Sequence, residues 1–256
     1  MISRREVVLG GALTILWGGG ACPGHAQTRT RQEYRGCVLT DSELSSYYNT
    51  KEEIRMYLTG SEPIKQKSGN PNFDYALAQT LARLTSTLQV LPGFAYYDDH
   101  DGLNAFASPA VRLHRADGTV LFGERLLRRL MSGTDHPDVA VTAICAHEYG
   151  HVLQFKRGLI QQLRAGQATV KRAELHADYL AGYYAGRRKL DKPDYPAAVF
   201  AHTQHSFGDN QVNHPSHHGT PVERANAIIM GFNVGNKDKR ELDEAVQIGL
   251  NYVARL

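Results

Sequence analysis

The chain has 256 residues, of which 42% are hydrophobic and 21% are charged. This composition is ordinary for a soluble globular protein with one domain or at most two small ones. The formal net charge is only +3, and the Lys and Arg residues are scattered along the chain rather than clustered. The charge pattern therefore argues against a nucleic-acid-binding protein.

The first part of the chain predicts an export signal. Arg4 and Arg5 precede a mostly apolar run at 7–21, which is shorter than the about 20 residues that a membrane-spanning helix needs. A small-x-small sequence, GHA, follows, as in a signal peptide, and the arginine pair resembles the twin-arginine signal. We expect residues 1–26 to be removed and the protein to be periplasmic or secreted, with no stable membrane span. Lipidation at Cys22 and a retained membrane anchor are the alternatives.

The rest of the chain divides into an extension and one domain. Residues 27–72 are polar and rich in turn residues, with a helix expected from about Asp41 to Leu58, and their role is unknown. Residues 73–256 are expected to form the domain that carries the function. Two cysteines are left after processing, Cys37 and Cys145, which could pair in an oxidising compartment, although Cys145 fits a small buried core residue better.

The pattern of apolar residues predicts an α+β fold, a small sheet packed on helices. Asp135 or Asp138 is the expected N-cap of a central helix that ends at Lys156, and a tight turn is expected between the second and third strands. The predicted strands lie at 93–99, 102–115 and 118–123. The predicted helices lie at 73–91, 124–131, 139–156 and 167–189.

The central helix carries the sequence HEYGH at 147–151. His147 and His151 lie one turn apart on one face of a helix, so both imidazoles can reach one ion at the 2.0–2.1 Å that zinc requires. Glu148 lies beside that ion, where it can take a proton from the attacking water. Gln154 and Arg157 stand where the extended metzincin motif needs Gly and His, so a third ligand must come from another segment.

The following helix supplies a candidate for the third ligand. Glu174 lies 23 residues after His151, which leaves room for a loop and a second helix. Asp178 is one turn further on the same face, where it can accept a hydrogen bond from a ligand His. His176 is an alternative ligand, but it points about 200° away from Glu174 around the helix. The constellation predicts a hydrolase with one zinc ion.

A stretch rich in His, NHPSHHGTPVERANA, follows the second helix. It offers His214, His217, His218 and Arg224 as groups that could stabilise the oxyanion formed during hydrolysis. For His214 and His217, a solvated loop is the favoured interpretation.

Several of these segments resemble known families. The sequences HEYGHVLQ, ELHADYLAGYYAG and FGDN followed by HGTPVERANAIIMGF look like those of bacterial neutral zinc metallopeptidases. The sequences NAFASP, GTVLFGERLLRRL and AICAHEYGH resemble the soluble catalytic domain of prenyl-protein-type zinc endopeptidases. The resemblance covers residues 75–233. Residues 28–72 match neither family, and the set of transmembrane helices of the prenyl-protein enzymes is not seen in the sequence.

The resemblance implies a minimal gluzincin domain, a zincin-like fold in which an edge strand lies above the metal. It implies His147, His151 and Glu174 as zinc ligands and Glu148 as general base. His218 and Arg224 match the positions that complete the site. The edge strand that would pair with substrate backbone is implied at Asn104, Ala105, Phe106 and Ala107.

The function expected from these features is an exported zinc metalloendopeptidase acting on a peptide or protein substrate. Two other classes stay open: a catalytically silent zinc-binding interaction protein, which an intact Glu148 argues against, and a zinc amidase acting on a cell-wall amide. The sequence reveals neither the cleavage preference nor the oligomeric state.

Overall fold

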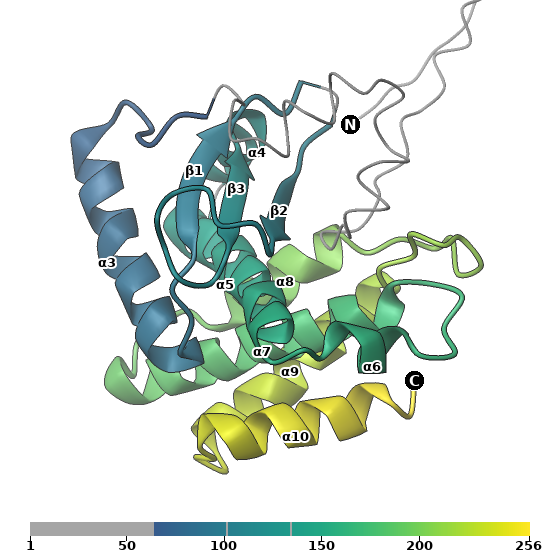
Figure 1. The fold of residues 1–256 in the computed structure, drawn as a ribbon. Helices are drawn as coiled ribbons and strands as arrows, with labels where there is room; N and C mark the ends of the chain where they lie inside the picture. The colour runs from purple at the N-terminus through teal and green to yellow at the C-terminus, as the bar shows by residue number, and fades with distance from the viewer. Residues whose placement is uncertain (1–63, 101, 134) are drawn as a thin grey trace, which may run out of the picture. The chain divides into compact units, whose positions relative to one another are not determined.

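The computed structural model describes residues 64–100, 102–133 and 135–256 (Figure 1). In this part of the chain a small three-stranded sheet packs against a set of helices, which confirms the predicted α+β class. The predicted signal peptide, the extension up to residue 63 and Cys37 lie outside the described residues. Among the helices described, none has the length and apolar character needed to cross a membrane.

The sheet has the strand order β1-β3-β2. Strand β1 (Gly93–Tyr97) runs parallel to β3 (Thr119–Gly123), and β2 (Ala105–Ser108) runs antiparallel to β3. Leu121 in the central strand pairs with Ala95 on one side and with Phe106 on the other. Strand β2, the predicted substrate-binding strand, is therefore an edge strand of this sheet.

A turn is present at residues 116 and 117, as predicted, but it does not join the second and third strands directly, because the second strand ends at Ser108 rather than at 115. The next residue, Pro109, has no N–H to donate to a sheet. The chain then takes a longer path to β3, which side chains including that of Thr119 hold in place. The hydroxyl of Thr119 donates a hydrogen bond to the carbonyl of Ala110 (2.8 Å) and accepts one from the backbone N–H of Arg112 (3.1 Å).

Helices account for most of the described residues, and four of them agree with the predictions within four residues at each end. These four are α3 (Pro71–Leu88), α4 (Glu124–Met131), α5 (Pro137–Lys156) and α7 (Lys171–Asp191). The other four were not predicted. They are α6 (Ile160–Arg164), α8 (Ala198–Ser206), α9 (Pro221–Asn236) and α10 (Leu242–Val253).

The predicted N-cap of the central helix α5 is wrong. The N-cap residue is His136, in the left-handed region at φ 50°, and its side chain makes no capping hydrogen bond. Pro137 starts the helix, because its fixed φ suits the first helical position and its missing N–H would have no partner there. Asp138 lies in the first turn instead, where a carboxylate interacts favourably with the helix dipole.

Helix α7 lies close to both α5 and α9, because small residues line its contacts. A Cβ added to Gly150 of α5 would lie 3.1 Å from the Cα of Ala177 in α7. A Cβ added to Gly182 of α7 would lie 2.1 Å from the carbonyl oxygen of Ile228 in α9. These backbone contacts place α7 between the two helices and determine which side chains meet there.

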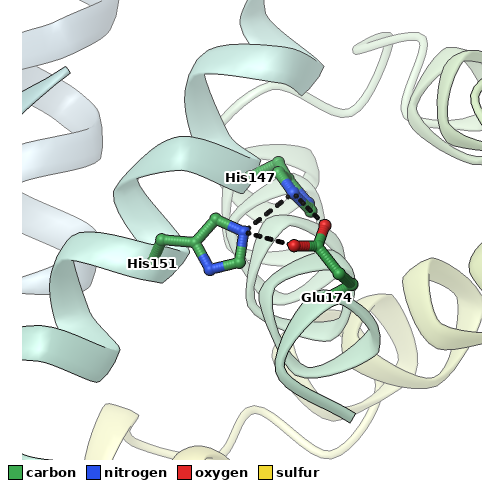
Figure 2. Close-up of side chains that lie close together, drawn as sticks. All are labelled: His147, His151 and Glu174. Atoms are coloured by element: carbon green, nitrogen blue, oxygen red, sulfur yellow. Dashed lines mark hydrogen bonds and ion pairs between the residues drawn. The ribbon is translucent and has the colours of Figure 1, made fainter. Parts of the chain in front are cut away.

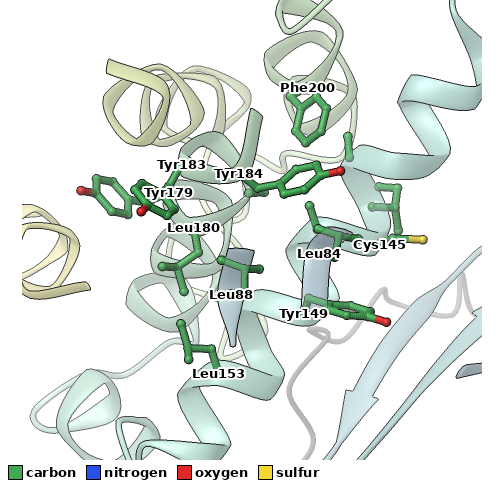
Figure 3. Packing of buried hydrophobic residues seen from close by; sticks show 14 of the residues in the cluster. Leu84, Leu88, Cys145, Tyr149, Leu153, Tyr179, Leu180, Tyr183, Tyr184 and Phe200 are labelled. Atoms are coloured by element: carbon green, nitrogen blue, oxygen red, sulfur yellow. The ribbon is translucent and has the colours of Figure 1, made fainter. Parts of the chain in front are cut away.

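The core lies between α3, α5, α7 and α8 (Figure 3). Leu84 and Leu88 of α3 are fully buried beside Leu153 of α5 and Leu180 of α7. Cys145 is a fully buried free thiol in the same cluster, and burial raises its pKa. The expectation that Cys145 is a core residue is confirmed.

Candidate metal centre

Three side chains from α5 and α7 converge in the interior (Figure 2). The Nε2 atoms of His147 and His151 are 3.1 Å apart. Glu174, in the first turn of α7, places one oxygen 3.3 Å from the Nε2 of His147 and the other 3.6 Å from that of His151. The ligand atoms all lie within 4.8 Å of one another, so this buried group could hold a metal ion.

The spacing of these atoms suits a small tetrahedral ion. Ligands at about 2.0–2.1 Å from a tetrahedral zinc lie about 3.3–3.4 Å from each other. The two Nε2 atoms here are 3.1 Å apart, and each lies 3.3 or 3.6 Å from a different oxygen of Glu174. The three side chains are at most 2% exposed. Neither oxygen of Glu174 accepts a well-formed hydrogen bond from any residue that the structure describes. Buried carboxylate oxygens of this kind suit a cation.

The outer nitrogens of the two imidazoles determine which tautomer each ring adopts. The Nδ1 of His147 lies 2.8 Å from Oδ1 of Asp178, and the Nδ1 of His151 lies 3.0 Å from Oε1 of Gln154. Both oxygens are acceptors, so each Nδ1 carries the proton and each Nε2 turns a lone pair toward the cluster. Two lone pairs and a carboxylate thus face one point.

Glu174 is held in its ionised form. Burial opposes ionisation, but the nearby rings of His151 and His218 keep the pKa of Glu174 well below its ordinary value. An ionised carboxylate is the form of Glu174 that metal binding requires.

Asp178 connects the cluster to α9. Its carboxylate accepts hydrogen bonds from Nε (2.8 Å) and Nη2 (3.0 Å) of Arg224 in addition to the one from His147. Burial opposes ionisation of Asp178, but Arg224 and His147 lower its pKa. The sequence predicted that Asp178 accepts a hydrogen bond from one of the two His residues, and in the structure its Oδ1 lies 2.8 Å from Nδ1 of His147.

Arg224 supports Asp178 and also borders the small cavity at Glu148 and His147. Besides Asp178, its guanidinium donates to Oε1 of Gln204 (2.9 Å) and to the carbonyl of Phe207 (3.2 Å), and the residue is 1% exposed. These contacts orient Asp178 and join α8 to α9. The direct role at the oxyanion expected for Arg224 stays a prediction.

Gln154 belongs to the site, although the sequence analysis did not identify it as a site residue. Its amide oxygen accepts from His151, while its amide nitrogen donates to the carbonyl of Ala173 (2.8 Å) and contacts Nδ1 of His176 at 3.2 Å. The signal was present in the sequence, because Gln154 lies three residues after His151 and so on the same helix face.

The alternative ligand His176 lies outside the cluster. Its Nδ1 contacts Gln154, and its ring stacks on that of Tyr179 with an interplanar angle of 11°. Burial lowers the pKa of His176 to about 4, so the ring is neutral. The carboxylate of Glu174, and not His176, completes the group of three.

Glu148 is 1% exposed and borders a small cavity of about 10 Å³. The cavity is also lined by His147, by Ala105 of the edge strand β2, and by Phe207. A space of that size holds about one water molecule. The general-base candidate and the edge strand therefore lie at the same cavity, on the His147 side of the cluster.

The four residues predicted as the substrate-binding strand have different environments. Asn104 precedes β2, and its carbonyl accepts hydrogen bonds from Gly123 and from the hydroxyl of Tyr97. Ala105 and Ala107 belong to the main core, whereas Phe106 faces the opposite side of the sheet, 5.4 Å from the ring of Tyr97.

Part of the loop between α8 and α9 is buried, unlike a solvated loop. His217 and His218 are 2% and 1% exposed, so the expectation of a solvated His217 is wrong. The carboxylate of Asp209 holds both, since its two oxygens contact Nδ1 of His217 and the backbone N–H of His218. His214 is half-buried, and its Nδ1 accepts from the N–H of Ser216. Asp209 lies in the FGDN segment of the resemblance, but the sequence analysis assigned it no role.

The fold and the site define a class: an α+β protein with a buried His-His-Glu group, on two packed helices, that could hold a metal ion. No family model, curated protein or solved structure matches the chain, so the comparisons assign it to no family. The resemblance seen in the motifs stays a prediction.

Proposed function

We propose that this protein is an exported zinc-dependent metalloendopeptidase of the gluzincin type. The observation that carries the proposal is the convergence of His147, His151 and Glu174 with Glu148 at the next helical position after the first ligand. Two imidazoles and a carboxylate are a ligand set of catalytic zinc, which leaves a fourth position for water or substrate.

The roles of the side chains follow from their positions. A bound zinc ion would lower the pKa of water and polarise the scissile carbonyl. Glu148, at the cavity beside His147, would take the proton of the attacking water and deliver it to the leaving amine. Asp178 and Gln154 keep the two imidazoles in the tautomer that turns Nε2 inward. Substrate backbone would pair along β2, whose Ala105 borders the same cavity.

The buried position of the cluster requires movement before a peptide can bind. The cavity at Glu148 has room for about one water molecule, not for a peptide. Phe207, which begins the loop after α8, lies at that cavity and is half-buried. We propose that this loop moves away when substrate binds, as loops over active sites commonly do.

The decisive experiment compares casein hydrolysis by the wild-type protein and by Glu148→Gln, with the zinc content of each measured. The substitution keeps the shape of the side chain and removes its basicity. We expect full zinc content and a turnover lower by about 10²–10⁴-fold. Glu244→Gln is a matched control, because Glu244 is half exposed on α10 and pairs only with Arg240 among the contacts resolved there. Equal turnover by Glu148→Gln and the wild type would refute the role of Glu148.

The burial itself favours a second candidate, a zinc-binding interaction protein without turnover. In that case the metal would hold α5 and α7 together, and Glu148→Gln would change neither zinc content nor any activity. Absence of casein cleavage by a zinc-loaded wild-type protein would support this candidate over the peptidase. A zinc amidase, the remaining alternative, would be identified by release of an amine from cell-wall material without casein cleavage.

A further inference from the structure

A cavity of about 550 Å³ lies where helix α3 packs beside strand β1 and helix α5 (Figure 1). Pockets for small molecules usually measure about 300–1,000 Å³. One wall of the cavity is a stripe of α3 residues at helical spacing, which spans three turns or roughly 16 Å. The stripe consists of Asp74, Leu77, Ala78, Leu81, Ala82 and Thr85.

Two small residues of α3 leave this space open. Leu84 and Leu88, on another face of the helix, are fully buried in the core, whereas Ala78 and Ala82 are exposed although they line the cavity. A methyl group does not fill the space beside the sheet, so α3 packs along its leucines and leaves a gap along its alanines. Phe94 of β1 adds apolar surface to the same cavity.

Helix α5 contributes Tyr149 to the wall. This residue lies two positions from both His147 and His151, about 200° away around the helix, and its hydroxyl points away from Leu180 of α7 (Figure 3). Of the described residues, none lines both this cavity and the one at Glu148, and none of the three candidate metal ligands lines it. The cavity is therefore a separate site on the other side of α5.

A buried donor at this cavity lacks an acceptor. The hydroxyl of Tyr96, a residue only 2% exposed, forms no hydrogen bond with any residue that the structure describes. Burial raises the pKa of Tyr96, and the nearby charge of Asp74 raises it further, so the hydroxyl keeps its proton and can donate. A buried donor without an acceptor costs free energy, and an oxygen atom of a ligand would supply the acceptor.

The two charged residues of the cavity differ in their contacts. Asp74 lies in the first turn of α3, where the helix dipole favours a negative charge, and its Oδ1 accepts from the backbone N–H of Ser68 (2.9 Å). Arg115 is exposed, and within the described part of the chain its guanidinium forms no ion pair. The cavity therefore favours an anion, and a carboxylate matches the paired N–H groups of a guanidinium.

We propose that this cavity binds a carboxylic acid with an extended apolar body, such as a fatty acid. The carboxylate accepts hydrogen bonds from Arg115 and from the hydroxyl of Tyr96. The apolar body lies along α3, over Leu77 and Leu81. An elongated wall of leucine and alanine side chains suits an alkyl chain better than a compact polar molecule.

The test is displacement of dansylaminoundecanoic acid, which fluoresces more strongly in apolar surroundings, from the isolated protein. The competitors are dodecanoate, dodecanol and dodecyltrimethylammonium, which share one alkyl chain, differ in charge and are used below their micellar concentrations. We expect dodecanoate to bind about threefold to tenfold more tightly than dodecanol, and the cation to bind most weakly. No saturable binding of the probe, or a cation that binds as well as dodecanoate, would overturn the proposal.

Ala82→Trp fills the cavity from an exposed position and should abolish binding of the probe. Ala76→Trp is the matched control, because Ala76 is exposed on the same helix and does not line the cavity. The melting temperature of each variant shows that it is folded. Equal probe binding by the two folded variants would place the ligand elsewhere and overturn the proposal.

Two further variants each remove one polar contact. Arg115→Gln should weaken dodecanoate binding about threefold to tenfold and leave dodecanol unchanged, with Arg129→Gln, exposed on α4, as the control. Tyr96→Phe should weaken dodecanoate binding by a similar factor without lowering the melting temperature of the ligand-free protein, because the hydroxyl loses no partner among the described residues. Unchanged dodecanoate affinity in both variants would overturn the proposal. Binding is measured without peptidase activity, so the result does not depend on the proposed function.

Discussion

At the scale of one residue, the contacts of His147 show how the candidate metal centre is built. One ring nitrogen faces the other ligands, and the opposite one is held by Asp178, which is itself held by Arg224. His151 has the corresponding support from Gln154. Each ligand therefore has a partner that keeps its tautomer and its direction, which is the general requirement of metal sites.

Glu174→Ala tests the third ligand. The substitution removes the only carboxylate of the metal-binding group found among the described residues, so we expect zinc affinity to fall by more than about 100-fold, beyond the 10–100-fold typical of supporting residues. Zinc bound after dialysis against a weak chelator is the measurement. Full occupancy in this variant would remove Glu174 from the ligand set.

Gln154→Leu tests the support of His151. Leucine fills a similar volume but accepts no hydrogen bond, so Nδ1 of His151 loses its partner and zinc affinity should fall by about 10–100-fold. Competition with a chromophoric chelator measures that affinity. The matched control is Gln247→Leu at an exposed position of α10, and equal affinities of the two variants would contradict the role of Gln154.

At the scale of helices, the close approach of α7 to α9 depends on residues without side chains. A Cβ at Gly182 would meet the carbonyl oxygen of Ile228 at 2.1 Å, and one at Gly231 would meet that of Tyr179 at 1.8 Å. Backbone atoms cannot move aside as flexible side chains do, so the two helices would have to separate. Such a separation would also shift Arg224, on α9, away from Asp178, on α7.

Gly182→Ala is therefore expected to destabilise the protein by about 1–3 kcal/mol or more, the usual cost of overpacking. It should also weaken zinc binding through the Arg224–Asp178 pair. Urea unfolding measures the first effect. Gly102→Ala serves as the control, because a Cβ there meets nothing within 4 Å and its φ is not positive. A Gly182→Ala protein as stable as that control would contradict the tight α7–α9 contact.

At the scale of the whole molecule, the sequence predicted the parts of the fold that have a local cause. Leucines at helical spacing and the punctuation of Pro92 and Gly93 predicted α3 and the start of the sheet. The HEYGH spacing brought His147 and His151 together without any knowledge of the fold, because a helix fixes that distance by itself.

The parts that were missed depend on contacts between distant segments. No helix was predicted for α8, α9 or α10, and the burial of these helices in the core is a tertiary effect. The bidentate pairing of Arg224 with Asp178 joins residues 46 positions apart, and Asp209 contacts His217 and His218 across a loop that has no periodic signal. The wrong N-cap of α5 reflects Pro137, whose fixed φ started the helix without a side-chain cap.

Export tests a property of the whole chain. The twin-arginine route carries folded proteins, which would suit a metal group whose ligands come together only after α5 and α7 pack. We expect that changing Arg4 and Arg5 to Lys stops export, although the charge is kept. Cell fractionation with processing of the precursor as readout measures this. Normal processing and periplasmic recovery of the double-Lys protein would rule out that route and leave general secretion.

The pairing of Arg224 with Asp178 has a consequence for quality control. Helix α9 is the second-last helix of the chain, and His147 lacks the Asp178–Arg224 support until it docks. If zinc binds as proposed, its affinity is expected to be low while α9 is misplaced and to rise once α9 has docked. A copy in which α9 cannot dock would then hold zinc poorly, so that retention of the ion would report on complete assembly.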